Sequence, residues 1–361
     1  MFVLRVLSLF LGACILLHGS VTHAFGDAEQ PTRQRKNTYL VNDPEKMERL
    51  GLTAGPLDDY LFDQDCPERG TLEKAKYYCP PLHRDKPIMV YLPYGYSEEQ
   101  RYNVLILLPG LHGTTRDWFV QSRTSPFTGG LTGQTLLDNM IWHGDCEPLI
   151  VVSMLSTWYE GSDFSYKDTV FAEELRDYAL PYIVANYSTY AKADGSDLEA
   201  NRSHFALAGL SLGAISVTDA GLKYCSDLIS WFGAFSYGSS DASISEIVEQ
   251  LNGPFRDYPV DCLYIACGEQ DMANEVDGVC LSRHTAQNTY MRLLAETEGA
   301  INEENSIFTW IGGNHRWNTW HICLYNALQL FFVDRNTETA PPCHGSPPAG
   351  GQFQRRENSV K

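Results

Sequence analysis

The sequence predicts an α/β fold with a mostly parallel central sheet and helices on both of its faces. Short apolar segments such as 103–110 and 148–155 alternate with segments of helical periodicity such as 171–187. The short segments are apolar at nearly every position, which is typical of parallel strands that are buried on both faces. The alternation continues without an internal repeat, so we expect one domain built around one sheet.

The strand predictions rest on continuous branched and apolar residues bounded by turn residues. The predicted strands are 88–96, 103–110, 148–155, 204–209, 229–236, 261–268 and 306–313. The predicted helices are 171–187, 211–222, 286–299 and 320–332. In the first of these helices the apolar residues recur on one face, and Pro181 is expected to kink it because proline lacks a backbone N–H.

The first 24 residues have the pattern of a secretory signal peptide. Arg5 precedes an apolar stretch, and small residues lead to a cleavage site after Ala24. A lipoprotein signal at Cys14 is the alternative, disfavoured by the apolar residues that follow it. We expect a secreted protein, extracellular or periplasmic, with no membrane span. The expected organisation after the signal peptide is a lead-in segment at 25–60, one domain at 61–333 and a disordered Pro/Gly-rich tail at 334–361.

Charge and cysteine content narrow the possible partners and cofactors. A formal net charge of −18 disfavours nucleic acid and anionic lipid as partners. Of the ten cysteines, Cys14 lies in the signal peptide, and the odd number that remains leaves at least one thiol without an intrachain partner. Cys66 and Cys79 form the most plausible local disulfide. No CxxC spacing occurs, so we expect neither a metal nor a cofactor.

Residues 209–213 read GLSLG, a G-x-S-x-G motif with Ser211 between two glycines. The motif falls where a predicted strand meets a predicted helix. A serine on such a tight turn is forced outward at the edge of the sheet, in a backbone that only small neighbours tolerate. The helix behind it brings backbone N–H groups and a positive dipole end near the hydroxyl. We therefore predict that Ser211 is a nucleophile.

A serine nucleophile needs a base to take its proton and a carboxylate to orient that base. In this architecture the acid and then the histidine follow the serine along the chain. Asp271, just after the strand 261–268, is the expected acid, with Glu269 and Asp277 as alternatives. His315, in a loop that begins with two glycines at the end of the last predicted strand, is the expected base. Chain order or a place inside the closing helix disfavours His112, His143, His204, His284 and His321.

Two further sets of residues are expected to surround the serine. The loop 107–118 follows an early strand, and Gly110 lets it turn, so the N–H groups of Leu111 and Leu212 are the predicted oxyanion donors. Tryptophans flank the predicted site loops and are expected to form an aromatic wall for a ring or a sugar face. They are Trp118, Trp158, Trp317 and Trp320.

Taken in order, these motifs resemble the feruloyl and acetylxylan esterases of carbohydrate esterase family 1, in the esterase D-like branch of the α/β-hydrolases. The resemblance covers most of 68–333. The segments that carry it are 90–118, 136–141, 147–154, 171–183, 201–214, 264–271 and 312–328. The resemblance implies an α/β-hydrolase fold and ester hydrolysis through an acyl-enzyme.

The sequence departs from the family pattern near the serine. Pro109 precedes Gly110 where the family usually has His-Gly, and Leu212 and Ala214 replace the usual Met and Gly. Proline removes a backbone donor, so the shape of the loop is expected to differ. None of the changes removes a catalytic group. Because of these departures, the family pattern does not determine which ester is the substrate.

Export and the resemblance together favour a feruloyl esterase that releases hydroxycinnamate from plant cell-wall arabinoxylan. The alternative is an acetylxylan or other short-acyl esterase, which would need a smaller acyl pocket. A non-catalytic carbohydrate-binding protein is a third hypothesis, disfavoured because serine, acid and histidine occur in the required order. The expected partner is accordingly a polysaccharide ester or a small aromatic or acetyl ester.

Overall fold

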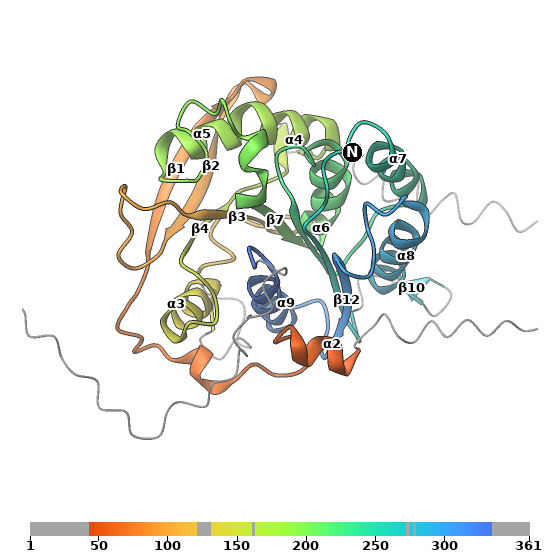
Figure 1. Ribbon diagram of the computed structural model, residues 1–361, viewed down its shortest axis with the longest axis horizontal. Helices are drawn as coiled ribbons and strands as arrows, with labels where there is room; N and C mark the ends of the chain where they lie inside the picture. Colours follow the sequence, from red (N-terminus) through yellow and green to blue (C-terminus); the bar gives the residue numbers. More distant parts are fainter. Residues whose placement is uncertain (1–42, 121–130, 161–162, 272–274, 277–278, 334–361) are drawn as a thin grey trace, which may run out of the picture.

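An eight-stranded sheet forms the centre of the computed structural model, which describes residues 43–120, 131–160, 163–271, 275–276 and 279–333 (Figure 1). In spatial order the strands are β1 (Thr71–Cys79), β2 (Arg84–Leu92), β4 (Leu149–Ser153), β3 (Asn103–Leu108), β7 (Phe205–Leu210), β8 (Trp231–Phe235), β9 (Cys262–Gly268) and β12 (Ser306–Ile311). Strand β2 pairs antiparallel with both of its neighbours, and every later pair is parallel. The predicted mostly parallel sheet is confirmed.

Helices cover both faces of this sheet, as predicted (Figure 1). One face carries α4 (Asp168–Glu174), η4 (Leu175–Ala179), α5 (Leu180–Asn186), α6 (Leu212–Ser216), η6 (Val217–Leu222), α7 (Asp241–Asn252) and α8 (Leu281–Glu296). The other carries α2 (Pro44–Arg49), α3 (Gly133–His143) and α9 (Trp317–Leu330). Shorter elements are η2 (Asp59–Phe62), η3 (Pro80–Leu82), η5 (Glu199–His204) and the strand pairs β5 (Trp158–Glu160) with β6 (Asp163–Ser165) and β10 (Glu275–Val276) with β11 (Val279–Cys280).

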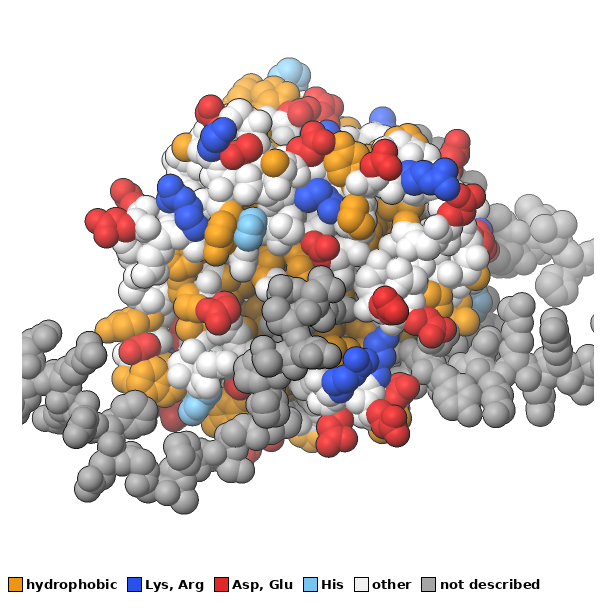
Figure 2. Space-filling model, viewed as in Figure 1, with side chains coloured by type: hydrophobic (Ala, Val, Ile, Leu, Met, Phe, Trp, Pro, Cys, Tyr) orange, Lys and Arg blue, Asp and Glu red, His pale blue; other side chains and the backbone are white. Residues whose placement is uncertain are grey.

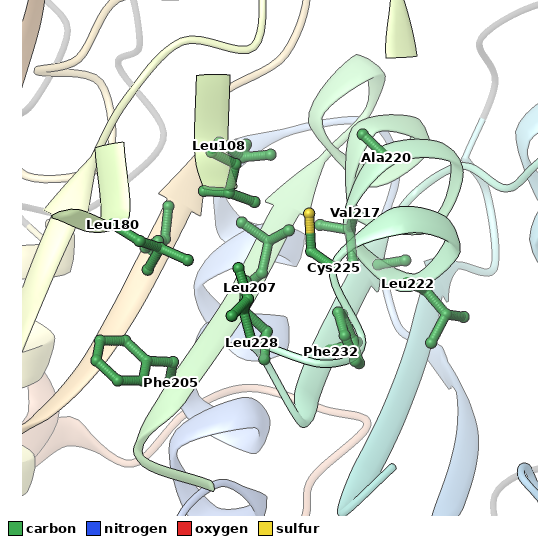
Figure 3. Packing of buried hydrophobic residues seen from close by; sticks show 14 of the residues in the cluster. Leu108, Leu180, Phe205, Leu207, Val217, Ala220, Leu222, Cys225, Leu228 and Phe232 are labelled. Carbon is green, nitrogen blue, oxygen red and sulfur yellow. The ribbon is translucent and has the colours of Figure 1, made fainter. Parts of the chain in front are cut away.

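Strand β7 shows why the predicted strands are apolar throughout. Successive strand residues point to opposite faces of a sheet. Phe205 and Leu207 pack into the core on the side of α6, whereas Ala206 and Ala208 pack into the core on the side of α9. Figure 3 shows Phe205 and Leu207 among the side chains of the first of these cores. Since both faces are covered, every position of the strand is buried.

The helix predicted over 171–187 is interrupted ahead of Pro181. An α-helical turn gives way to the π segment η4, and α-helix resumes at Leu180. Proline cannot donate a backbone hydrogen bond and its ring crowds the preceding turn, so a widened segment before it is the physical result. The predicted kink therefore takes the form of a π insertion.

The predicted lead-in segment belongs to the folded domain from residue 43 onward. Lys46 Nζ donates to the carbonyl oxygen of Ser306 at 3.0 Å, and the Thr53 amide donates to Asn326 Oδ1 at 2.9 Å. These bonds attach the segment to β12 and α9. The boundary predicted at residue 61 thus lies inside the packed unit. The predictions for 1–24, for the start of the lead-in segment and for 334–361 fall outside the described residues.

The structure contradicts the predicted Cys66–Cys79 disulfide. Cys66 Sγ lies 3.7 Å from the carbonyl oxygen of Asp138, whose side chain accepts the amide of Gly70 just before β1. Cys79 is the last residue of β1, and the strand from Thr71 to Cys79 spans roughly 26 Å at about 3.3 Å per residue. The two thiols are free, as are the other described cysteines, which are Cys146, Cys225, Cys262, Cys267, Cys280 and Cys323.

None of the helices in the described part of the chain has both the length and the apolar character needed to cross a membrane. Acidic and basic side chains are interspersed over the visible face of the molecule, around a hollow that contains apolar side chains (Figure 2).

Candidate active site

Ser211 occupies the sharp turn between β7 and α6. Its backbone has φ 55° and ψ −118°, a conformation that is costly for a residue with a Cβ. The Ser211 amide donates to the carbonyl oxygen of Phe235 at 2.8 Å, which continues the strand pairing past the end of β7. The strain is held by the sheet, and it turns the hydroxyl away from the core.

Both glycines of the motif are required by close backbone contact. A Cβ at Gly213 would lie 2.5 Å from the carbonyl oxygen of Leu108, and one at Gly209 would lie 2.7 Å from the backbone of Gly213. Side chains at these two positions would push α6 away from β3 and β7. The glycines therefore set the distance between the serine and the loop that follows β3.

The structure brings Ser211, His315 and Asp271 together from three separate loops. His315 Nε2 lies 3.0 Å from Ser211 Oγ, and His315 Nδ1 lies 2.8 Å from Asp271 Oδ1. An ionised carboxylate can only accept, so Nδ1 carries the proton and donates it to Asp271. Nε2 is then free to accept the proton of the serine hydroxyl.

Glycines also allow the acid loop and the histidine loop to approach one another. A Cβ at Gly268, which ends β9, would lie 2.8 Å from the carbonyl oxygen of Gly313. Asp271, three residues after Gly268, is fully buried, whereas Glu269 is exposed to solvent. Asp277, the other alternative acid, lies outside the described residues.

The surroundings of Asp271 favour its ionised form. Burial alone would raise the pKa of this carboxyl group, but the hydrogen bond and charge of His315 and the hydroxyls of Ser236 and Ser282 outweigh burial and lower the pKa below its usual value. Ser282 Oγ donates to Asp271 Oδ1 at 2.7 Å. The sequence analysis did not identify either serine.

An aromatic contact fixes the position of the histidine ring. The ring of Trp320 packs edge-on against that of His315, with centroids 5.0 Å apart. The Trp320 indole N–H donates to Ser236 Oγ at 3.0 Å. Trp320 is therefore a supporting residue behind the histidine.

The loop after β3 lies directly against the serine. A Cβ at Gly110 would lie 3.1 Å from the Cβ of Ser211, a tight contact, so a side chain there would press against the serine. Leu111 follows and its side chain is exposed. Leu212 is the first residue of α6, where backbone N–H groups have no acceptor within the helix. Leu111 and Leu212, the two predicted oxyanion donors, thus follow directly after residues that contact or form the serine turn.

The four tryptophans do not form one exposed wall. Trp118 is 0% exposed and packs in the core, edge-on to Trp317 with centroids 5.3 Å apart, so we withdraw its assignment as a substrate contact. Trp158 is 9% exposed on β5, and Trp320 is 8% exposed. Trp317 is half-buried at the start of α9. It remains the best placed of the four to meet a ligand.

Three of the histidines that the sequence disfavours as the base have other contacts. His321 is buried within α9, and burial lowers its pKa to about 4. His204 stacks on Tyr190 and contacts Asn103 at 2.7 Å, while His143 packs against Tyr60. Among the described residues no group of three or more His, Cys, Asp or Glu side chains is placed to hold a metal ion.

Comparison with known proteins places this geometry in a family. The sequence model described as "Putative esterase" matches residues 80–331. The chain is 27% identical over 287 residues to endo-1,4-beta-xylanase Y of Acetivibrio thermocellus, covering 76% of this chain and 24% of the xylanase. It thus spans about a quarter of that relative. It is 26% identical over 268 residues to the uncharacterized protein YjcH of Bacillus subtilis, covering 73% and 98% of the two chains.

Solved structures share the fold. A feruloyl esterase module from Clostridium thermocellum superposes with a TM-score of 0.63 at 23% identity, over 79% of this chain and 95% of the module. A ferulic acid esterase from Anaeromyces mucronatus gives a TM-score of 0.59 at 22% identity, over 78% and 97%. The match to the family model covers more than half of the sequence. The chain therefore belongs to the putative esterase family of carboxylic ester hydrolases.

Proposed function

We propose that the protein is a secreted feruloyl esterase in which Ser211 is the nucleophile, His315 the general base and Asp271 the residue that orients the base. The observation that carries the proposal is the continuous chain of contacts from Ser211 Oγ through the imidazole to the buried carboxylate. A serine hydroxyl attacks an ester only when its proton is removed during the attack, and this arrangement provides the acceptor.

The first half of the reaction forms an acyl-enzyme. Ser211 Oγ attacks the ester carbonyl as its proton passes to His315 Nε2, and negative charge develops on the carbonyl oxygen. The amides of Leu111 and Leu212 donate to that oxyanion. Asp271 stabilises the positive imidazolium. His315 then gives the proton to the departing sugar oxygen, and the ester bond breaks.

The second half releases the acid. Water takes the place of the sugar, gives a proton to His315 Nε2 and attacks the acyl carbonyl. The oxyanion forms again between the two amides. When it collapses, Ser211 Oγ leaves and takes the proton back from the imidazolium, which restores the free enzyme.

Three findings support an aromatic acyl group on a polysaccharide. The similar structures from Clostridium thermocellum and Anaeromyces mucronatus were solved with sinapinate and ferulic acid. The similar curated relative is a xylanase. The half-buried Trp317 lies beside Trp320, which packs on the base, and its partly exposed ring is suited to contact an aromatic acid. The signal-like first 24 residues support export to the place where such polymers occur.

The test is a substrate panel of methyl ferulate, p-nitrophenyl acetate and acetylated xylan, measured with the wild type, Ser211→Ala and a surface control, Ser245→Ala on α7. We expect hydrolysis of methyl ferulate, a fall in kcat of at least about 10⁴-fold in Ser211→Ala, and an unchanged rate in the control. Release of acetate without release of ferulate would reject the feruloyl substrate. Undiminished hydrolysis by Ser211→Ala would reject the nucleophile.

A further inference from the structure

The two carboxylate oxygens of Asp271 have unequal surroundings. Oδ1 accepts from His315 Nδ1 at 2.8 Å and from Ser282 Oγ at 2.7 Å. Oδ2 is buried and, among the described residues, has no hydrogen bond of good geometry. A carboxylate offers about four acceptor positions, and a buried oxygen without a donor is unfavourable. A donor for Oδ2 is therefore to be sought among the neighbouring hydroxyls.

Ser236 has the features of that donor. It follows β8 as Ser211 follows β7, and the last residues of these two strands, Leu210 and Phe235, are paired. Like Ser211 it has a positive φ, 62°, and it is fully buried. Strain of this kind persists only where the surroundings enforce it, and it concentrates at functional sites. Glycine would adopt this positive φ at a lower cost, so the backbone conformation does not explain why the residue is a serine.

The hydroxyl of Ser236 is already oriented by Trp320. The indole N–H donates to Ser236 Oγ at 3.0 Å and so occupies a lone pair of that oxygen. The hydroxyl proton is left to donate elsewhere. Asp271 is close enough for the Ser236 side chain to contribute to the lowered pKa of the carboxyl group. A small rotation of the hydroxyl toward Oδ2 would complete the bond.

We propose that Ser236 and Ser282 are positioning residues for Asp271: Ser282 holds Oδ1, and Ser236, oriented by Trp320, donates to Oδ2. The inference rests on the proposed roles of Ser211, His315 and Asp271. It extends them by assigning how the acid is kept ionised and aligned. It also links acid and base through one side chain, because the ring of Trp320 packs on His315 while its N–H fixes Ser236.

The effect is expected on the protonation of the Asp271–His315 pair. Without a hydroxyl donor the carboxylate attracts a proton more strongly, so the pair remains protonated to a higher pH. Burial raises the pKa of the Cys267 and Cys323 thiols, which leaves them neutral beside the pair. The titratable and charged groups around Asp271 and its serine partners are His315, Cys267, Cys280, Arg283 and Cys323.

The experiment compares the pH dependence of kcat/KM for methyl ferulate in Ser236→Ala, Ser236→Gly, Ser282→Ala and Trp320→Phe. We expect the acid limb to move upward by about half a unit to one unit in each variant, with kcat lowered about tenfold and KM little changed. Trp231→Phe is the matched control. It removes an indole N–H that donates to Ser203 at the opposite end of β8, so its profile should be that of the wild type.

The two Ser236 variants separate positioning from folding. Glycine relieves the positive φ and alanine does not, so Ser236→Gly should have the higher melting temperature while both show the same shifted acid limb. An acid limb equal to that of the wild type in either variant, or a loss of kcat that follows the melting temperature, would overturn the proposal. Retained activity in Ser211→Ala would instead reject the proposed function itself.

Discussion

At Asp271, burial and the neighbouring hydrogen-bond donors act on the carboxyl group in opposite directions. Its carboxylate is shielded from solvent, yet the groups around it lower its pKa, with the hydrogen bond from His315 as the largest favourable contribution. The consequence is that His315 is held in the tautomer whose Nε2 can accept a proton. In the proposed mechanism the acid therefore acts through the imidazole and does not touch the ester.

Asp271→Asn is expected to lower kcat by about 10³- to 10⁴-fold with little change in KM, because the amide favours the wrong histidine tautomer. Steady-state kinetics on methyl ferulate, with a melting curve for each protein, checks this expectation. Glu269→Gln is the control, since Glu269 is exposed two residues earlier in the same loop. Full activity of Asp271→Asn would contradict the assignment of Asp271 as the acid and favour the alternative, Asp277.

Chain order and strand ends predict that Ser211, Asp271 and His315 meet at one edge of the parallel sheet, and the structure places the His315 side chain within hydrogen-bond distance of the other two. Sequence patterns did not separate Trp118 from Trp317, because which tryptophan is buried depends on how α3 and α9 pack. Ser236 directly follows β8, the strand paired with β7, and that position is the signal by which it could have been found. Ser282 has no comparable signal.

At the scale of elements, the site depends on how closely α6 approaches β3. The carbonyl oxygens of Leu108 and Pro109 lie 2.5 and 2.7 Å from where a Cβ of Gly213 would be. Neither group is the free end of a flexible side chain, so any added atom must move a helix or a strand. The same contact sets the distance between the loop that carries Leu111 and the start of α6 at Leu212, the two proposed oxyanion donors.

Gly213→Ala is therefore expected to destabilise the protein by about 1–3 kcal/mol, as overpacking does, and to reduce kcat by misplacing the oxyanion donors. Gly55→Ala provides the comparison, because a Cβ there would only reach 4.0 Å from Thr53 Oγ1. Denaturant unfolding and ester hydrolysis are measured on both variants. Equal stability of the two would show that the contact at Gly213 is not tight.

The order and type of the main elements are predictable because strand and helix periodicities differ and proline and glycine mark their limits. The prediction omits β1, α2, α3 and α7. For α7 a signal is present, since Ser240 caps the helix and Ile244, Ile247 and Leu251 lie on one face. The short strand pair β5–β6 is also absent from it, since elements of three residues have too few positions to show a period. Pro181 marks the irregularity at η4, whereas the π segment η6 depends on packing and has no such marker in the sequence.

At the scale of the whole molecule, the buried His321 makes stability depend on pH. Its pKa in the folded protein is about 4, against 6.5 in an unperturbed histidine. The unfolded chain therefore takes up the proton first as the pH falls. The stability contributed by the neutral ring is complete above pH 6.5 and is lost progressively between pH 6.5 and 4.

From pH 7.5 to pH 5 the wild type is expected to lose about 2 kcal/mol more stability than His321→Leu, which has nothing to protonate at this position. Denaturant unfolding at several pH values measures the difference. His284→Leu, at an exposed position on α8, should keep the dependence of the wild type. Parallel curves for wild type and His321→Leu would contradict the assignment.

The attachment of the first described segment to the last elements has a consequence for how the chain matures. Thr53 and Asn326 are 273 positions apart, and the backbone N–H and C=O of Thr53 both bond to the side-chain amide of Asn326. Lys46 bonds to Ser306 at the start of β12. The fold cannot close until nearly the whole polypeptide has been made. For the proposed export this order of events is favourable, because a chain whose first and last elements pair late remains unfolded, and able to pass through a narrow channel, until residue 326 is available.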